Sequence, residues 1–243
     1  MAKKPLRIGQ APSKAASRSK DIARRRLPEV DVPENIRDAV SRLKRERIIA
    51  TAVQHFYRNG FNKTTLEAVA EAMNVTKPFI YSHFTSKSEL LAEICSRGIR
   101  SSLEALQKAL SLHGTATGKL ETMAREFMLA VLHNQAHIAI YNREEKHLAL
   151  DDREAINTLR REFDHEVTSL LAEGVEAGEF QVADVQLAAL AIGGIVSWSC
   201  VWYRPSGRLS QVQTADRMAG LVLQMVGAKA VRRRRASAVA AAC

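Results

Sequence analysis

The segment from Gly60 to Leu90, GFNKTTLEAVAEAMNVTKPFIYSHFTSKSEL, constrains the fold more than any other part of this chain. Thr64 or Thr65 can cap a short helix, because a threonine hydroxyl accepts hydrogen bonds from the free amides at a helix start. Asn74 stands where the chain must turn sharply, and asparagine tolerates the left-handed conformation that such a turn requires. Thr76 is placed to cap a second short helix. The segment therefore predicts a helix, a tight turn and a second helix.

Helical periodicity continues on both sides of this segment. A long helix is expected over 36–59, where apolar residues recur at helical spacing and Asn59-Gly60 provides the stop. Ser86 and Glu89 form a capping-box pattern at the start of a helix that runs to Leu112. No alternating strand pattern bounded by turns occurs, so the predicted fold class is all-α, with a three-helix helix-turn-helix head before a helical bundle. The later helices are expected over 117–133, 135–148, 151–177, 184–204 and 210–227.

Charge divides the chain into four predicted segments. The net charge of +10 is concentrated in residues 1–28, with nine Lys or Arg and one Asp, and in residues 229–243, with five basic residues and no acid. Residues 35–88 carry nine basic and four acidic groups, and residues 89–228 carry 13 basic and 18 acidic groups. We therefore predict a basic mobile arm over 1–33, a helix-turn-helix domain over 34–88, a helical body over 89–228 and a basic tail over 229–243. The arginine runs of the arm and the tail are typical of polyanion-binding segments, or of solvated tails that aid solubility.

The cysteine spacing and the longest uncharged stretch indicate the cellular compartment of the protein. The cysteines at 95, 200 and 243 show no metal-binding or disulfide spacing, which indicates reduced cytosolic thiols. Residues 185–203 form a 19-residue stretch without a charge, but Gly and Ser dilute it, which favours a buried helix over a membrane span. No apolar segment typical of a secretory signal occurs near the N-terminus. A soluble, cytoplasmic protein is expected.

The helix-turn-helix segment resembles the DNA-binding head of the TetR family. The resemblance rests on a Thr-Thr opening, on Ala70-x-x-x-x-Val75-Thr76, and on Tyr81, His83-Phe84 and Ser86-Lys87-x-Glu89-Leu90, over about 50 residues. Pro78 and Phe79 depart from the glycine and threonine that the family usually carries there, so the family's base contact does not transfer to Phe79. The resemblance implies a non-enzymatic transcriptional regulator without a cofactor. Such a protein is a homodimeric repressor that a small effector releases from a palindromic double-stranded DNA operator.

DNA-contacting residues are assigned by their chemistry. Lys77 and Lys87 carry mobile ammonium groups suited to phosphate, and Thr65 can offer its hydroxyl or amide to one. Thr76, Phe79, Tyr81 and Ser82 project from the predicted recognition helix, where Phe79 can pack on thymine methyl groups. The resemblance also favours Tyr81 and Lys87 as backbone contacts. Each has a structural alternative: a solvated lysine, an aromatic side chain that packs in the core, or a threonine that only caps a helix.

The body over 89–228 corresponds to the ligand-binding and dimerisation domain of the family. The predicted helix over 184–204 is apolar nearly all round, and Gly193-Gly194 allows close backbone approach, so one face can pack inside the subunit and another against a partner. The string from Trp202 to Ser210 is similar to TetR-type regulators of sterol-ring, aromatic and fatty-acid breakdown, whose effectors are often coenzyme A thioesters. The alternatives are packing within one subunit and a plain helix-loop-helix linker.

The resemblance to those regulators leads us to predict an acyl-CoA effector site in the body. The acyl part needs an apolar cavity, and the nucleotide part needs a local cluster of arginines, since guanidinium binds phosphate through two parallel hydrogen bonds. Ordinary core packing and surface ion pairs are the alternative roles for these side chains. The apolar candidates are Leu103, Met123, Phe127, Val131, Ile138, Tyr141, Phe163 and Trp198. The arginine candidates are Arg125, Arg143, Arg160, Arg161 and Arg204.

Other features of the sequence allow two other functions. His133, His137, His147 and His165, beside many carboxylates, can suggest an enzyme, but their spacing matches no metal motif and no nucleophile motif or Gly-rich phosphate loop occurs, so no catalytic or metal-ligating residue is assigned. A nucleoid-type DNA-binding protein without an effector would explain the basic tails, but it leaves the large apolar body without a use.

Overall fold

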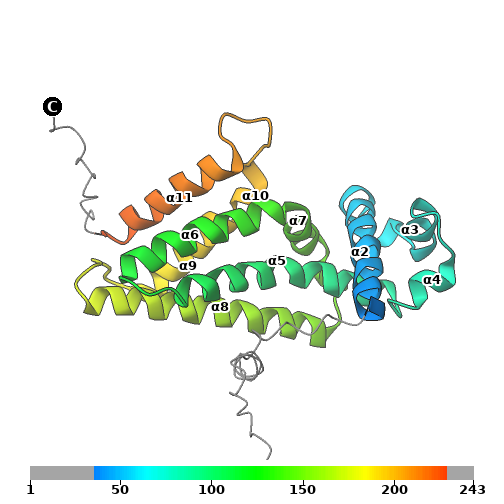
Figure 1. Ribbon diagram of the computed structural model, residues 1–243, viewed down its shortest axis with the longest axis horizontal. Coiled ribbons are helices and arrows are strands. Elements are labelled where there is room, and N and C mark those ends of the chain that lie inside the picture. The colour runs from blue at the N-terminus through cyan, green and yellow to red at the C-terminus, as the bar shows by residue number, and fades with distance from the viewer. Residues whose placement is uncertain (1–35, 229–243) are drawn as a thin grey trace, which may run out of the picture. The chain divides into compact units, whose positions relative to one another are not determined.

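The computed structural model describes residues 36–228, and every regular element in that range is a helix (Figure 1). The chain divides into two compact units, 1–44 and 45–243. Of the first unit, the structure describes only the opening turns of α2 (Ile36–Lys63), where the predicted stripe residues Ile36, Val40 and Leu43 are exposed. The predicted basic arm over 1–33 and basic tail over 229–243 lie outside the described residues.

The second unit begins with the helices of the predicted head. The long helical stretch of α2 stops at Gly60 as predicted, because Gly60 has the non-helical values φ 79° and ψ 170°, and a short helical stretch follows this kink and ends at Lys63. The apolar side chains of its second half, Ile48, Ala52 and Phe56, are fully buried. The two short helices that follow are α3 (Leu66–Ala72) and α4 (Lys77–Tyr81).

The turn between α3 and α4 has the predicted geometry. Asn74 has a φ of 55°, the single positive value at a non-glycine residue among residues 36–228. Thr65 caps α3, because its hydroxyl accepts a hydrogen bond from the amide of Ala68 at 3.1 Å. Thr76 occupies the cap position of α4, but its side chain makes no capping hydrogen bond, so its predicted capping role is not seen. Its hydroxyl is therefore left for other partners.

The body is a bundle in which α6 lies between α5 and α11, and α5 also packs along α8 (Figure 1). Capping residues set several of the helix starts: Ser86 accepts a bond from the amide of Glu89, and Ser210 forms a complete capping box with Gln213. The carboxylate of Glu89 instead accepts bonds from Thr85. The helices of the body are α5 (Lys87–Leu110), α6 (Ala116–His133), α7 (Gln135–Glu144), η1 (Glu145–His147), α8 (Leu150–Glu176), α9 (Val185–Ser197), α10 (Ser199–Trp202) and α11 (Gln211–Met225).

Two predicted helices are interrupted. The helix expected over 135–148 ends at Glu144 and tightens into the 3-10 turn η1, in which the amide of Leu148 donates to the Glu145 carbonyl. The helix expected over 184–204 tightens at Trp198, whose carbonyl accepts from the amide of Val201 three residues later. Both interruptions arise from local hydrogen-bond geometry that leaves the apolar periodicity unchanged.

Side chains pack into two hydrophobic cores. One core joins the second half of α2, α3, α4 and the first half of α5, and it takes in Ile140, Tyr141, Leu148 and Ile156 from α7, α8 and the segment between them. The other core fills the bundle of α5, α6, α8, α9 and α11. The helix α5 contributes to both, as does the α7 region, so these two elements link the head with the bundle.

One stretch within residues 36–228, Val185–Trp202, is long and apolar enough to cross a membrane by length and composition, with a mean hydropathy of 1.6. Only 22% of this stretch is buried. A helix that packs against another protein surface meets the same criteria, so the stretch by itself is weak evidence for a membrane span.

Candidate DNA-binding surface and ligand cavity

The recognition helix α4 is held to the core by one face and exposed on the other. Ile80 and Phe84 are fully buried beneath it. Thr76, Tyr81 and Ser82 are exposed, although the Ser82 hydroxyl donates to the carbonyl of Phe79 at 2.8 Å. α4 thus presents polar groups and one tyrosine ring outward.

Phe79 is half-buried at the edge of this exposed face. Its ring packs against the core of the head and lies edge-on to the imidazole of His83, with ring centroids 5.4 Å apart. Part of the phenyl surface remains accessible. Both interpretations of Phe79 from the sequence, a base-contacting side chain and a packing side chain, therefore have a basis in its position.

The two predicted phosphate-binding lysines differ in their surroundings. Lys77 is exposed, pairs with Glu67 of α3, and lies 5.5 Å from the centre of the Tyr81 ring. An exposed ion pair of this kind contributes little stability, so a phosphate can replace Glu67 at low cost. The pairing raises the pKa of Lys77, chiefly through the hydrogen bond to Glu67, and the ammonium group stays charged.

Lys87 has a structural role that the sequence did not indicate. Its ammonium group donates to the carbonyls of Phe61 and Thr64, both at 2.9 Å, and lies 4.2 Å above the Phe61 ring. It therefore places a positive charge at the C-terminal end of α2, where the free carbonyl groups form the negative end of the helix dipole. Because an ammonium group has three N–H donors, one remains for a phosphate.

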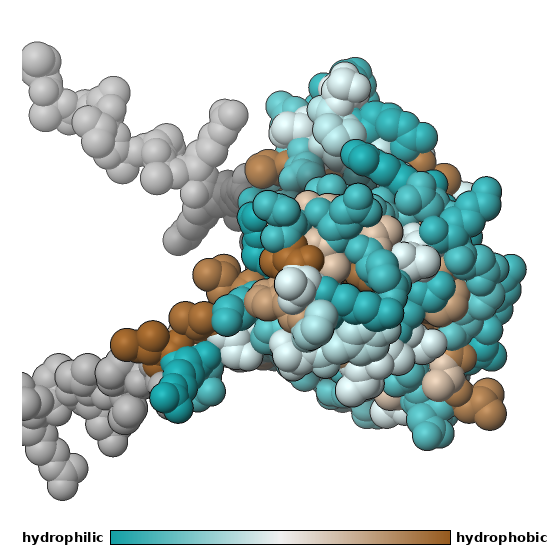
Figure 2. All heavy atoms as spheres, turned by 90° about the vertical axis from the view of Figure 1, so that its right-hand side faces the viewer, coloured by the Kyte–Doolittle hydropathy of each residue, from teal (hydrophilic) through white to brown (hydrophobic). Residues whose placement is uncertain are grey.

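The side of the molecule on which α3 and α4 lie is mostly hydrophilic in Figure 2. Thr65 and Lys77 are exposed on these helices. A polar surface around two short helices suits a charged, hydrated partner better than an apolar one.

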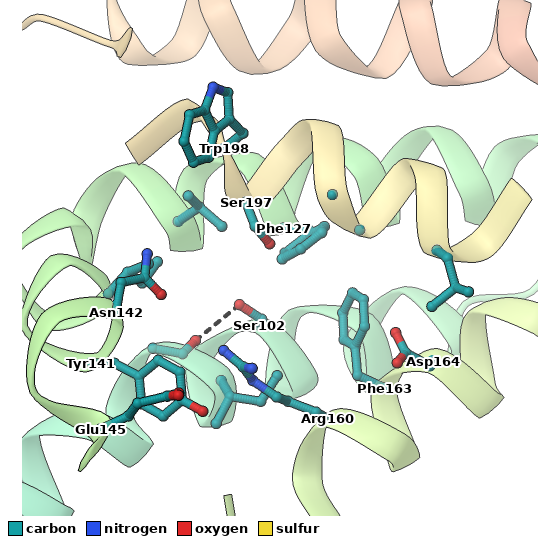
Figure 3. Close-up of a pocket in the computed structure, with 17 residues that line it drawn as sticks. Ser102, Phe127, Tyr141, Asn142, Glu145, Arg160, Phe163, Asp164, Ser197 and Trp198 are labelled. Carbon is teal, nitrogen blue, oxygen red and sulfur yellow. Dashed lines mark hydrogen bonds between the residues drawn. The ribbon is translucent and has the colours of Figure 1, made fainter. Parts of the chain in front are cut away.

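A cavity of about 740 Å³ lies in the body between α5, α6, α7, α8 and α9 (Figure 3). This volume lies in the range of ligand pockets in proteins, about 300–1,000 Å³. Phe127 and Phe163 form part of its wall, with ring centroids 4.7 Å apart. Trp198, which is 61% exposed, stands at its edge. The cavity can enclose an apolar group of moderate size.

Three ionisable residues besides Tyr141 line this cavity: Arg160, Glu145 and Asp164. The guanidinium of Arg160 lies 4.3 Å above the Tyr141 ring. Burial, together with a hydrogen bond to Glu145, raises the pKa of Tyr141. Burial also raises the pKa of Asp164, against an opposing effect of Arg160. The cavity thus combines apolar walls with a few polar groups placed around it, which Figure 3 labels.

The structure brings together seven of the thirteen residues that the sequence predicted for a ligand site, and these seven line the cavity: Phe127, Val131, Ile138, Tyr141, Arg160, Phe163 and Trp198. Leu103 and Met123 are instead buried in the bundle core. Arg204 lines a neighbouring cavity of about 610 Å³ that shares Asn142 with the first one.

Three predicted arginines have partners elsewhere. Arg125 pairs with Asp216 of α11 at 2.8 Å, and Arg161 pairs at 2.5 Å with Glu154, which lies two turns earlier on the same helix, α8. Arg143 pairs with Glu144 at 2.7 Å, and its guanidinium donates to the backbone carbonyls of Phe56 and Tyr57 at the end of α2. These three side chains do not line either cavity. For Arg125 and Arg143 the partners lie on distant elements, α11 and α2, which the sequence alone does not show.

The polar residues of the cavity were not predicted from the sequence. Ser102, Asn142, Glu145, Asp164 and Ser197 all line it. One signal was available: Glu145 follows Tyr141 by four residues and Asp164 follows Arg160 by four, the spacing that places two side chains on one helix face. Leu190, Gly193 and Gly194 of α9 were expected to pack, and they line the cavity as well.

An exposed apolar surface covers α9, α10 and α11, and we call it the α9–α11 face. A Cβ atom at Gly193, Gly194 or Gly220 would meet nothing within 4 Å. Apolar patches of this extent are unusual on the surface of a monomer. The large exposed apolar side chains of this face are Leu187, Leu190, Ile195, Trp198, Val201, Trp202, Val212, Leu221 and Met225.

The histidines that suggested an enzyme do not assemble. His147 stacks on the Phe61 ring at 4.8 Å, and His137 lies half-buried near Arg97 and Glu46. Within residues 36–228 no group of three or more His, Cys, Asp or Glu side chains is placed to hold a metal ion.

Comparison with known proteins gives matches over both parts of the chain. Residues 48–94 match the family described as bacterial regulatory proteins, tetR family, and residues 113–226 match the tetracyclin repressor-like C-terminal domain. The HTH-type transcriptional repressor KstR2 of Mycolicibacterium smegmatis is 29% identical over 185 residues, which cover 74% of this chain and 89% of that protein.

Solved structures share the fold. A tetR-family regulatory protein from Rhodococcus RHA1 is similar with a TM-score of 0.69 and 26% identity, over 76% of this chain and 98% of that one. The structure of AibR in complex with isovaleryl coenzyme A and operator DNA is similar with a TM-score of 0.65 and 23% identity, over 76% of this chain and 100% of that one. From the two family matches and the helix-turn-helix geometry, the chain belongs to the TetR family and is a DNA-binding transcriptional repressor, not an enzyme.

Proposed function

We propose that this repressor is a homodimer that binds a palindromic operator and leaves it when an acyl-CoA thioester occupies the cavity of the body. The cavity carries this proposal: it has aromatic walls, an arginine and a volume of about 740 Å³ within a TetR-family body. Support from a fold relative comes from AibR, whose structure holds both isovaleryl coenzyme A and operator DNA.

The α9–α11 face supports dimerisation through these three helices. Its exposed tryptophans and leucines would be shielded from water by a second copy, and Gly220, which does not line the cavity, leaves room for a partner backbone. Because a two-fold dimer presents two recognition helices, the operator half-sites should lie roughly 34–36 Å apart, or a multiple of that distance.

DNA contact is proposed for the exposed side of α3 and α4. Thr65, Thr76, Lys77, Tyr81 and Ser82 are all exposed there. Phe79 is the proposed base-contacting residue, and Lys87 keeps one N–H for a phosphate beside its structural bonds. We also propose that the chain is divided into a head over 34–88 and a body over 89–228. A cytoplasmic location is proposed as well, because the operator is found there.

The effector site is proposed to use both cavities. The acyl group would enter the larger cavity beside Phe127 and Phe163, where its apolar surface is removed from water. The phosphates need positive charge, which Arg160 supplies at the larger cavity and Arg204 at the neighbouring one. Asn142 lines both cavities, so a ligand that spans them would pass this residue. Arg125, Arg143 and Arg161 are engaged elsewhere and have a smaller part in this proposal.

Ligand binding to the free protein tests the effector proposal. Acyl-CoAs of differing chain and ring type should bind in calorimetric titrations and raise the melting temperature, while coenzyme A alone and the free acids should bind more weakly. Phe163→Ala should weaken acyl-CoA binding, whereas Leu150→Ala, at an exposed position remote from the cavity lining, should not. A protein that binds free acids as tightly as thioesters would contradict the proposal.

A further inference from the structure

The carboxylate of Asp164 lies in the wall of the larger cavity without a bonding partner. Its backbone carbonyl accepts a hydrogen bond from Thr168 at 2.7 Å, but within the described part of the chain its side chain accepts none and forms no salt bridge. Phe163 precedes it in the sequence, and Phe127 and Leu190 line the same cavity. Figure 3 shows the carboxylate beside Phe163 at the margin of the cavity. A charged group in such surroundings lacks part of its hydration.

Of the other two charged groups of the cavity, Glu145 is already engaged, whereas Arg160 acts on Asp164 electrostatically and keeps N–H donors for a ligand. Glu145 accepts the hydrogen bond of the Tyr141 hydroxyl, and the guanidinium of Arg160 stacks over the Tyr141 ring at 4.3 Å. With these groups in their ordinary charge states, the lining holds one positive and two negative charges. Asp164 is therefore the carboxylate that remains for a ligand hydroxyl, in a lining where two carboxylates face one guanidinium.

We propose that Asp164 is a specificity-determining residue that selects an uncharged acyl group bearing a hydroxyl and rejects an acyl group that ends in a carboxylate. This inference rests on the proposed function, namely acyl-CoA binding in the larger cavity. A ligand hydroxyl that donates to the Asp164 carboxylate forms a charge-assisted hydrogen bond, which is stronger than one between neutral groups. A ligand carboxylate would place a like charge beside Asp164 in surroundings that screen charge poorly.

The apolar walls and Asp164 together define the chemical class of the effector more narrowly than the apolar walls alone. Phe127 and Phe163 accept the hydrocarbon part, whether it is a chain or a ring. Asp164 adds the requirement that the acyl group carry a hydrogen-bond donor next to that hydrocarbon part. The class is a hydroxylated acyl thioester, and thioesters of dicarboxylic acids are excluded by the same carboxylate.

Calorimetric titration of the full chain with four six-carbon thioesters tests this inference: hexanoyl-CoA, 3-hydroxyhexanoyl-CoA, 6-hydroxyhexanoyl-CoA and adipoyl-CoA. One of the two hydroxylated ligands should bind about tenfold more tightly than hexanoyl-CoA, and adipoyl-CoA should bind about tenfold more weakly. In Asp164→Asn the penalty on adipoyl-CoA should disappear, because the like charge is removed. In Asp164→Leu the advantage of the hydroxyl should disappear as well.

The matched control is Asp151→Asn, which removes an exposed carboxylate from the first turn of the same helix and should leave the ranking unchanged. If the four ligands rank in the same order of affinity in the unmutated protein and in both Asp164 variants, the inference is overturned and the acyl-CoA proposal stays intact. The same holds if adipoyl-CoA binds most tightly to the unmutated protein. Failure of every thioester to bind would overturn both.

Discussion

At the scale of single residues, the exposed side of α4 decides how the repressor reads DNA. Phe79→Ala removes a half-buried ring that can contact thymine methyl groups, so it should change which operator sequence is preferred. Tyr81→Ala removes a hydroxyl suited to phosphate and should weaken binding by ~1–2 kcal/mol for all duplexes alike. Gel-shift titrations against the operator and single-base variants measure both effects. An unchanged base preference in Phe79→Ala would assign that ring to packing alone.

Lys87 gives a second residue-scale prediction, because its ammonium group bonds two carbonyls at the end of α2. Lys87→Met keeps the aliphatic stem but loses those bonds, which should lower the free energy of unfolding by ~1–3 kcal/mol. Thermal or urea unfolding measures this change. If Lys87 acts only on phosphate, stability will be unaffected, and the salt dependence of DNA binding will instead fall by about one unit in its slope. Lys77→Met, at an exposed position, is the comparison variant.

At the scale of elements, α7 connects the ligand cavity with the head. Tyr141 and Asn142 line the cavity, while the next two residues, Arg143 and Glu144, contact the end of α2. Glu144 is buried beside Gly60, where a Cβ atom would lie 3.1 Å from its carboxylate oxygen. The helix α5 offers one connection, because its side chains belong to the cores of both the head and the bundle. The structure shows that α7 offers a second, shorter connection.

Arg143→Gln tests this connection, since it removes the charge that bonds the Phe56 and Tyr57 carbonyls. Acyl-CoA should still bind with nearly unchanged affinity, but a given fraction of bound ligand should release less operator. Parallel calorimetry and operator-release titrations separate the two quantities. Arg161→Gln, whose side chain pairs with Glu154 away from the cavity, should behave as the unmutated protein does. Equal release by both variants would remove α7 from the coupling.

Most elements could be predicted because short-range chemistry sets their ends. The cap at Thr65 and the left-handed turn at Asn74 occur where they were expected. The breaks at Glu144 and Trp198 could not be predicted, since both depend on hydrogen bonds three residues apart within an unbroken apolar pattern. For the candidate cavity, aromatic positions such as Phe127 and Phe163 were found from their apolar periodicity. Asp164 was not, because its four-residue spacing from Arg160 is equally that of an ordinary ion pair on a helix surface.

At the scale of the whole molecule, the α9–α11 face should hold two copies together. Gly220→Leu places a large side chain on α11, outside the cavity lining, where a Cβ atom now meets nothing within the subunit, so the monomer should fold normally. In a dimer the same side chain would force the partner backbone away, at a cost of roughly 1–3 kcal/mol. Sedimentation equilibrium at micromolar concentration should show weaker association for this variant. A monomer for the unmutated protein would contradict the proposed interface.

The central claim is that an acyl-CoA thioester releases this TetR-family repressor from its operator. Titration of a preformed protein–operator complex with acyl-CoAs, the matching free acids and coenzyme A measures it directly, with fluorescence anisotropy of the labelled duplex as the readout. Release requires that the ligand bind the DNA-incompetent state more tightly than the competent one. Anisotropy should fall with added thioester and stay constant with free acid or coenzyme A. Constant anisotropy with every thioester, together with an unchanged melting temperature of the free protein, would contradict it.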